Sequence, residues 1–163
     1  MLSMTTDQIR SSFVNCTKGE AKRFATPSLD GVDWENLDYF GWRDPGSTVA
    51  GAMCVWRGDE PVSIMLRATV RPASAKQGMC SLCHTFHPSS DVAFMGARRA
   101  GTRGREGNTV AAAMCADLAC SLYSRKLRQS RRVQPQETLD LDARVARLQM
   151  NLDRFVARVV DGL

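Results

Sequence analysis

The chain has 163 residues, 44% of them hydrophobic, and its 22 basic against 17 acidic residues give a formal net charge of +5. This length suits one domain with its own hydrophobic core. No apolar run approaches the roughly 18 residues of a membrane span, and the N-terminus lacks the apolar segment of a signal peptide. We therefore expect a cytoplasmic protein with reduced thiols and no membrane partner.

Two short helices are predicted near the N-terminus. Thr5 or Thr6 can cap the first, whose apolar face carries side chains between positions 9 and 14. Residues 17–20 have the Thr-x-x-Glu pattern of a capping box, which opens a second helix that ends near Phe24.

The next part of the chain predicts a β-hairpin. A helical turn at residues 33–38 and a turn at 41–45 come first, and the aromatic residues within them are expected to be core. Residues 48–57 and 61–70 are then rich in Val, Ile, Met and Trp and flank a short Gly-Asp-Glu turn. Two such runs around a turn of this composition are typical of a hairpin.

A second hairpin follows a loop at residues 71–78. Its strands are predicted at residues 91–99 and 108–114, joined by a glycine- and arginine-rich segment that we interpret as a flexible basic tip. A phosphate-binding loop is disfavoured there, because the Gly-Lys-Ser/Thr ending is missing.

Two helices complete the chain. Residues 116–128 have a helical pattern, and a polar linker at 131–136 separates them from a long amphipathic helix that begins at Thr138. The apolar stripe of this last helix consists of Leu141, Val145, Leu148, Leu152, Phe155, Val156 and Val159.

Four of the six cysteines form two close pairs. Cys80 and Cys83 are spaced Cys-x2-Cys, and Cys115 and Cys120 are spaced Cys-x4-Cys. Four thiolates in two pairs suit the tetrahedral coordination of one structural Zn²⁺. A disulfide framework would need an oxidising compartment. A redox dithiol at the first pair would leave the second pair unexplained.

The order of these elements predicts a treble-clef zinc finger: a Cys-x2-Cys knuckle, a hairpin, and a helix that carries the last ligand. The predicted fold class is therefore α+β, with N-terminal helices and a β-hairpin (1–75), a treble-clef finger (76–130) and a C-terminal amphipathic helix (137–161). We interpret these parts as one domain spanning residues 1–163. Four thiolates leave no coordination position for water, so the zinc is expected to be structural.

The remaining cysteines and the two histidines leave alternatives open. His87 could replace Cys115 or Cys120 as a ligand, or hydrogen-bond to one of them. A zinc nuclease built on His84 would need acidic or histidine ligands that the helix, with Asp117 alone, does not supply. No other catalytic motif is found, so we expect neither an enzyme nor a small-molecule substrate. Both Cys16 and Cys54 are expected to be small core residues.

Basic residues concentrate between positions 96 and 132. This stretch holds nine basic residues against two acidic ones, so the positive field belongs to the zinc region and the helix after it. Such a field favours a partner with negative charge, either RNA phosphates or an acidic protein face. On charge and expected exposure, the predicted partner contacts are Arg98, Arg99, Arg103, Arg105, Lys126 and Arg128.

Five segments in this order carry a family resemblance: residues 13–21, 41–45, 79–83, 101–108 and 115–123. Together they resemble the C-terminal treble-clef zinc-finger domain of elongation factor G-binding proteins, the FusB-type fusidic acid resistance family. More closely, the chain resembles the stand-alone actinobacterial form of that domain. The resemblance runs from about residue 6 to residue 155.

The resemblance implies a non-enzymatic translation accessory protein that binds elongation factor G and promotes its release from the ribosome. It also implies that Cys80, Cys83, Cys115 and Cys120 are the zinc ligands, although the family's resistance proteins use a closer second pair that contains a histidine. No counterpart of their N-terminal helical bundle is expected in this sequence, so factor binding rather than drug protection is the expected shared property. The alternative function is an RNA-binding zinc protein that docks on the ribosome, which the scarcity of aromatic residues in the basic region disfavours.

Overall fold

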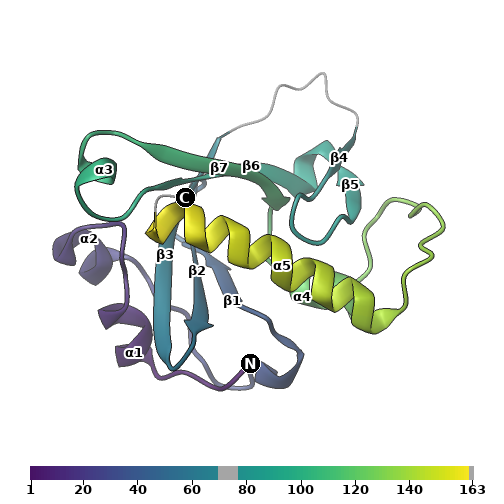
Figure 1. Ribbon diagram of the computed structural model, residues 1–163, viewed down its shortest axis with the longest axis horizontal. Helices are drawn as coiled ribbons and strands as arrows, with labels where there is room; N and C mark the ends of the chain where they lie inside the picture. Colours follow the sequence, from purple (N-terminus) through teal and green to yellow (C-terminus); the bar gives the residue numbers. More distant parts are fainter. Residues whose placement is uncertain (70–76, 162–163) are drawn as a thin grey trace.

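The computed structural model describes residues 1–69 and 77–161. Within this part, five strands form one antiparallel sheet in the order β1-β2-β3-β6-β7 (Figure 1). Their bounds are β1 (Phe40–Arg43), β2 (Ala50–Arg57), β3 (Glu60–Thr69), β6 (Val92–Arg98) and β7 (Thr109–Cys115). A separate two-stranded sheet pairs β4 (Gln77–Met79) with β5 (Phe86–Pro88), which precedes the 3₁₀ turn η2 (Ser89–Asp91). Among the described residues, no helix combines the length and apolar character needed to span a bilayer.

Both predicted hairpins are confirmed. Strands β2 and β3 pair from Ala50 opposite Arg67 to Arg57 opposite Glu60, and Gly58 supplies the left-handed φ of +62° that the tight turn needs. Strands β6 and β7 pair in the same antiparallel way. The predicted turn at residues 41–45 is wrong in part, because residues 40–43 pair with β2 as an edge strand before the chain turns.

The tip of the second hairpin is helical, not the flexible loop that the glycines indicated. The helix α3 (Gly101–Arg105) folds back on the end of β6, and the main-chain N–H of Asn108 donates to the carbonyl of Arg103 at 3.0 Å. Position 104 requires a glycine, since a Cβ there would lie 1.8 Å from the carbonyl oxygen of Arg99. The glycine serves a close backbone contact rather than mobility.

Alternate residues of β2 supply two cores on the two faces of the sheet. Met53 and Val55 pack with the long helix α5 (Leu141–Val160), which lies across the sheet in Figure 1. Ala52 and Cys54 face the other side, where Phe40 and Trp42 stack with ring centroids 5.2 Å apart. The predicted burial of the aromatic segment and of Cys54 is thus confirmed, whereas Cys16 is only half-buried.

Three short helices cover this second face or its edge: α1 (Thr6–Ser11), α2 (Lys18–Arg23) and the 3₁₀ turn η1 (Trp34–Asn36). Capping boxes begin α1 at Thr5 and α2 at Thr17. The first helix is shorter than the apolar pattern predicted, because Phe13 forms a bridge to Ser63 of β3 and leaves the helical path.

Tertiary contacts also shorten the last two helices. The predicted helix at 116–128 is confined to α4 (Cys120–Ser124), since Leu118 adopts a left-handed φ of +57° that no helix accommodates. Helix α5 begins at Leu141, after Asp140, whose carboxylate accepts a hydrogen bond from the N–H of Ala143. Its stripe is buried from Leu148 onward, but Leu141 is exposed. The predicted loop at 71–78 lies mostly outside the described residues.

Candidate metal centre

The first cysteine pair sits on a tight turn between β4 and β5. The N–H of Leu82 donates to the Cys80 sulfur at 3.4 Å, and the N–H of His84 closes the turn on the Cys80 carbonyl at 2.9 Å. His84 takes a left-handed φ of +59°, which redirects the chain immediately after Cys83. The N–H of Ser81 donates to the carbonyl of Ala113, so the turn is fastened to β7 beside the second pair.

The second pair lies at the ends of two elements, as the treble-clef prediction required. Cys115 is the last residue of β7 and Cys120 is the first residue of α4. The four residues between them loop over β1, and Leu118 at the crest packs directly on Gly41. A Cβ at Gly41 would lie 2.7 Å from the Leu118 Cβ, so the wider Cys-x4-Cys spacing depends on a missing side chain in β1.

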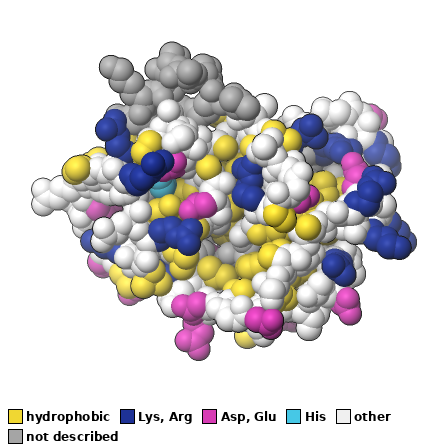
Figure 2. Space-filling view, turned by 180° about the vertical axis from the view of Figure 1, so that it is seen from behind, with side chains coloured by type: hydrophobic (Ala, Val, Ile, Leu, Met, Phe, Trp, Pro, Cys, Tyr) yellow, Lys and Arg dark blue, Asp and Glu magenta, His cyan; other side chains and the backbone are white. Residues whose placement is uncertain are grey.

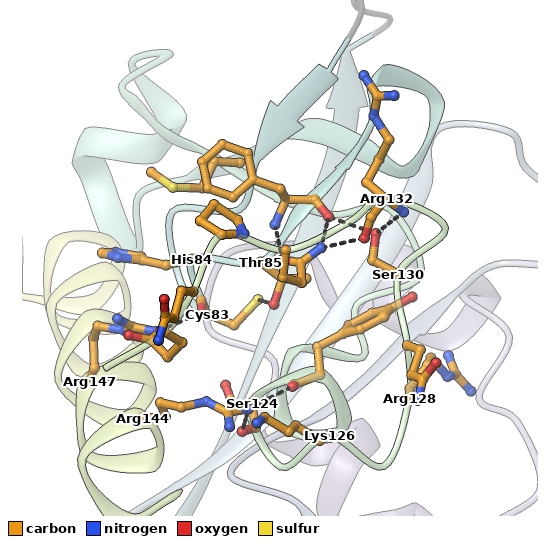
Figure 3. Close-up of a pocket in the computed structure, with 18 residues that line it drawn as sticks. Cys83, His84, Thr85, Ser124, Lys126, Arg128, Ser130, Arg132, Arg144 and Arg147 are labelled. Carbon is orange, nitrogen blue, oxygen red and sulfur yellow. Dashed lines mark hydrogen bonds and ion pairs between the residues drawn. The ribbon is translucent and has the colours of Figure 1, made fainter. Parts of the chain in front are cut away.

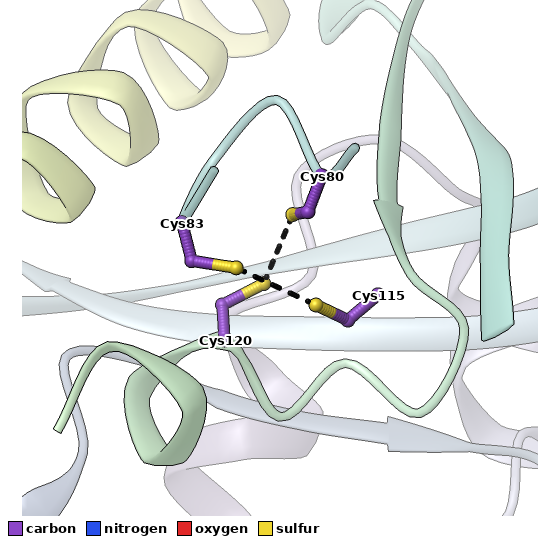
Figure 4. A group of neighbouring side chains, drawn as sticks. All are labelled: Cys80, Cys83, Cys115 and Cys120. Carbon is purple, nitrogen blue, oxygen red and sulfur yellow. Dashed lines mark hydrogen bonds between the residues drawn. The ribbon is translucent and has the colours of Figure 1, made fainter. Parts of the chain in front are cut away.

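The four sulfur atoms come together in a buried cluster (Figure 4). All lie within 4.8 Å of one another, and the sulfurs of Cys80 and Cys120 are 3.6 Å apart while those of Cys83 and Cys115 are 3.5 Å apart. Sulfurs bound at about 2.3 Å to one tetrahedral zinc would be about 3.8 Å apart. The cysteines are therefore positioned to bind one metal ion, and their soft sulfur donors suit zinc.

The ionisation of the buried thiols depends on their contacts with one another. Hydrogen bonds from Cys115 and the other two thiols hold the pKa of Cys83 well below its usual range. Hydrogen bonds with the other three thiols, of which that with Cys120 has the largest effect, raise the pKa of Cys115, and burial raises it further. Four adjacent buried thiolates repel one another, so a divalent cation is what allows all four to ionise together.

Two buried side chains border the cluster without joining it. His87 is 1% exposed, and its Nε2 lies 3.3 Å from the Cys115 sulfur, but it is not among the four ligand atoms that share the site. This placement favours a hydrogen bond to the thiolate over replacement of a cysteine ligand. The Tyr39 hydroxyl is buried, and its pKa is raised by burial first and by the neighbouring Cys120. It therefore stays a neutral O–H near the cluster, without a hydrogen-bond partner among the described residues.

Helix α5 supports the turn at Cys80–Cys83 from the outside. Asn151 donates its Nδ2 to the carbonyl of Leu82 at 3.0 Å, and it also lies 3.3 Å from the Nε2 of His84. His84 is thus turned away from the sulfurs and toward the helix. Neither Tyr39 nor Asn151 was singled out by the sequence reasoning, because each reaches the site through a distant element and belongs to no local motif.

The six basic residues predicted as partner contacts fall into two separate groups. Four of them surround the tip of the second hairpin, where Arg98 pairs with Glu20 of α2 at 2.8 Å. Figure 2 shows basic side chains gathered along the edge of the molecule that carries α2 and α3. The other two, Lys126 and Arg128, follow α4 beside the metal cluster, and Arg128 pairs with Asp117 at 2.8 Å.

Comparisons with known proteins agree with this geometry. A family model described as the FBP C-terminal treble-clef zinc-finger matches residues 8–159. No curated protein sequence matches the chain. Among solved structures, that of the fusidic acid resistance protein FusC is similar to this one with a TM-score of 0.56 and 12% sequence identity. The likeness covers 98% of this chain but 59% of FusC, so the chain spans less than two thirds of FusC. At this identity the likeness concerns the fold alone.

Proposed function

Because the chain belongs to the FBP C-terminal treble-clef zinc-finger family, we propose that it is a zinc-containing translation accessory protein that binds elongation factor G. The observation that carries the proposal is the family match over residues 8–159, together with a buried four-cysteine cluster at the predicted positions. The similar fold of a fusidic acid resistance protein agrees with the family assignment. Such binding would promote release of the factor from the ribosome, in the cytoplasm.

In this proposal Cys80, Cys83, Cys115 and Cys120 ligate one structural zinc ion. The ion would join the β4–β5 turn, the end of β7 and the start of α4. Zinc contributes about 10–16 kcal/mol to folding in zinc-finger peptides, which is ample to hold these segments together. Four thiolates leave no position for an activated water, which supports a binding role rather than an enzymatic one.

The hairpin tip is the face that best suits an acidic protein partner. Arg98 and Arg105 are exposed, and each is held by a hydrogen bond, to Glu20 and to Thr102 respectively, at 2.8 Å. Guanidinium groups that are already positioned lose less conformational entropy on binding carboxylates. We assign Arg98, Arg99, Arg103 and Arg105 to the main contact, and Lys126 and Arg128 to a second contact beside the metal cluster.

The test is a calorimetric titration of zinc-loaded protein against purified elongation factor G at low and physiological salt. One-to-one binding with a micromolar or lower Kd is expected at both, and it should be weaker at the higher salt. Absence of binding at both salts would refute the proposal. Binding to ribosomal RNA instead, with a steep dependence on salt, would identify the RNA-binding alternative.

A charge-reversal pair locates the interface. The double variant Arg103→Glu/Arg105→Glu should slow association by roughly tenfold or more, because it removes steering by the positive tip. The matched control is Arg154→Glu/Arg158→Glu, which reverses two exposed arginines on α5. Equal effects of the two double variants would show that net charge, rather than the hairpin tip, governs association.

A further inference from the structure

A pocket of about 540 Å³ opens next to the metal cluster, between the β4–β5 turn, the end of α4, the start of α5 and the linker that joins the two helices (Figure 3). Its volume falls in the range of small-molecule sites. The linker is fastened over the turn by Gln134, whose side chain accepts from the N–H of Phe86 and donates to its carbonyl, both at 2.9 Å. The pocket is therefore a built feature of the fold.

The charge of the lining is strongly positive. Five basic side chains face one carboxylate, that of Glu137, which Arg147 already binds at 2.8 Å. The basic side chains are Lys126, Arg128, Arg132, Arg144 and Arg147. They come from three segments of the chain and surround the pocket in Figure 3. The lining thus carries more basic than acidic side chains, although Arg128 at the rim also pairs with Asp117 outside the pocket.

The deepest of these cations is Arg144. It is 8% exposed, and its guanidinium donates to the main-chain carbonyls of Tyr123, at 3.2 Å, and of Ser124. Among the described residues it forms no direct ion pair, and the Glu137 carboxylate acts on it only at longer range. Burying a guanidinium without a counter-ion is costly, and an anion bound in the pocket would remove that cost.

Two further polar groups of the lining are buried without a hydrogen-bond partner among the described residues. They are the hydroxyl of Ser124, a residue that is 2% exposed, and the Nε–H of Arg147. Buried polar groups nearly always have a hydrogen-bond partner in folded proteins, so each of these two groups is expected to bind a ligand or a water molecule. Both groups can donate a hydrogen bond, and both lie in the lining beside Arg144.

We propose that this pocket binds the terminal phosphate of a nucleotide-sized small molecule. A phosphate offers the acceptor oxygens and the negative charge that Arg144, Arg147 and Ser124 require. Tyr123 and Phe86 supply an aromatic wall for the remainder of the ligand. The proposal is independent of factor binding.

The depth of the pocket favours a terminal phosphate over the phosphate backbone of a polynucleotide. Arg144 and Ser124 form the buried inner wall, while Lys126 is exposed and the Arg128 side chain keeps 47% of its surface accessible at the rim. A monoester at the end of a small molecule can reach the inner wall. A phosphodiester within RNA is flanked by sugars on both sides and would meet only the rim.

The test uses calorimetry on the zinc-loaded chain with inorganic phosphate, pyrophosphate and adenosine 5′-monophosphate, and with adenosine as the ligand lacking a phosphate. We expect saturable one-to-one binding of the phosphate compounds and none of adenosine. Arg147→Gln should weaken binding by about tenfold or more, the value of a charge-assisted hydrogen bond. Lys126→Gln, at the exposed rim, should weaken it less and cannot disturb the core. The control Arg158→Gln changes an exposed arginine of the same helix and should have no effect.

Zinc content and circular dichroism of each variant establish that it is folded. The assignment would be overturned if none of the phosphate compounds bound, or if both Arg147→Gln and Lys126→Gln bound them as tightly as the unaltered chain. Tighter binding of a short single-stranded RNA, lost in the same variants, would also overturn it in favour of a polynucleotide site.

Discussion

Replacing Gly41 by alanine should weaken both the fold and the metal centre. Phe40 and Trp42 point to the aromatic core, so a side chain at Gly41 would point to the opposite face, where the loop between Cys115 and Cys120 crosses β1. The added Cβ would lie 2.7 Å from the Cβ of Leu118 and 2.8 Å from its carbonyl oxygen. Neither atom can move by a side-chain rotation, so the loop itself must shift.

Overpacking of this kind costs about 1–3 kcal/mol. For a chain of this size, each kcal/mol lowers the Tm by about 2–4 °C, so a fall of about 2–12 °C is expected. If release of the metal lets the loop relax, the same energy lowers the zinc affinity by about 5- to 150-fold.

The matched control is Gly96→Ala in β6. A Cβ there would meet the carbonyl oxygen of Arg67 at 3.6 Å, an ordinary contact, and a strand residue other than glycine can even stabilise. Thermal unfolding gives the Tm, and competition with a chromophoric chelator gives the zinc affinity. Equal Tm and equal zinc affinity in the two variants would show that the approach of Leu118 to β1 is not what constrains the loop.

Four further outcomes are expected. Tyr39→Phe should lower the zinc affinity by about 10- to 100-fold in chelator competition, because it removes an O–H beside the thiolates; an unchanged affinity would contradict that role. Cys80→Ser, or removal of zinc by a chelator, should abolish cooperative unfolding of the finger in calorimetry, whereas an unaltered transition would show that the metal is dispensable. Arg125→Ala should cost about 3–5 kcal/mol in urea unfolding, since it leaves the Asp38 carboxylate, whose side chain is 2% exposed, with a hydrogen bond from Gln149 but without its counter-ion. The Glu20 carboxylate accepts hydrogen bonds from the main-chain N–H of Thr17 and from the Arg98 side chain, and these lower its pKa from 4.5 to about 2. The stability that Glu20→Gln removes should therefore be largest above about pH 4.5 and vanish as the pH falls toward 2.

Local patterns were sufficient for much of the fold. The helix cap at Thr5, the capping box at Thr17, the two hairpins and the stripe of α5 each follow from residues that lie near one another in the chain. The metal centre was also predictable, because ligand type and spacing restrict a Cys-x2-Cys turn to few roles. Predictions were wrong where distant contacts decide the conformation, as at Leu118, which ends the helical pattern by crossing β1.

The sequence by itself determined that four cysteines would come together in position to bind one metal ion and that positive charge would gather after residue 96. Only the tertiary structure decided which side chains surround these features. It divided the basic residues between the hairpin tip and the pocket, brought Tyr39 to the thiolates, and buried Arg144 and Ser124 beneath the linker. The physical reason is the range of the interactions. Turns, caps and ligand pairs are specified by neighbours along the chain, whereas burial and electrostatic environment depend on elements that meet only when the sheet, the finger and α5 pack together.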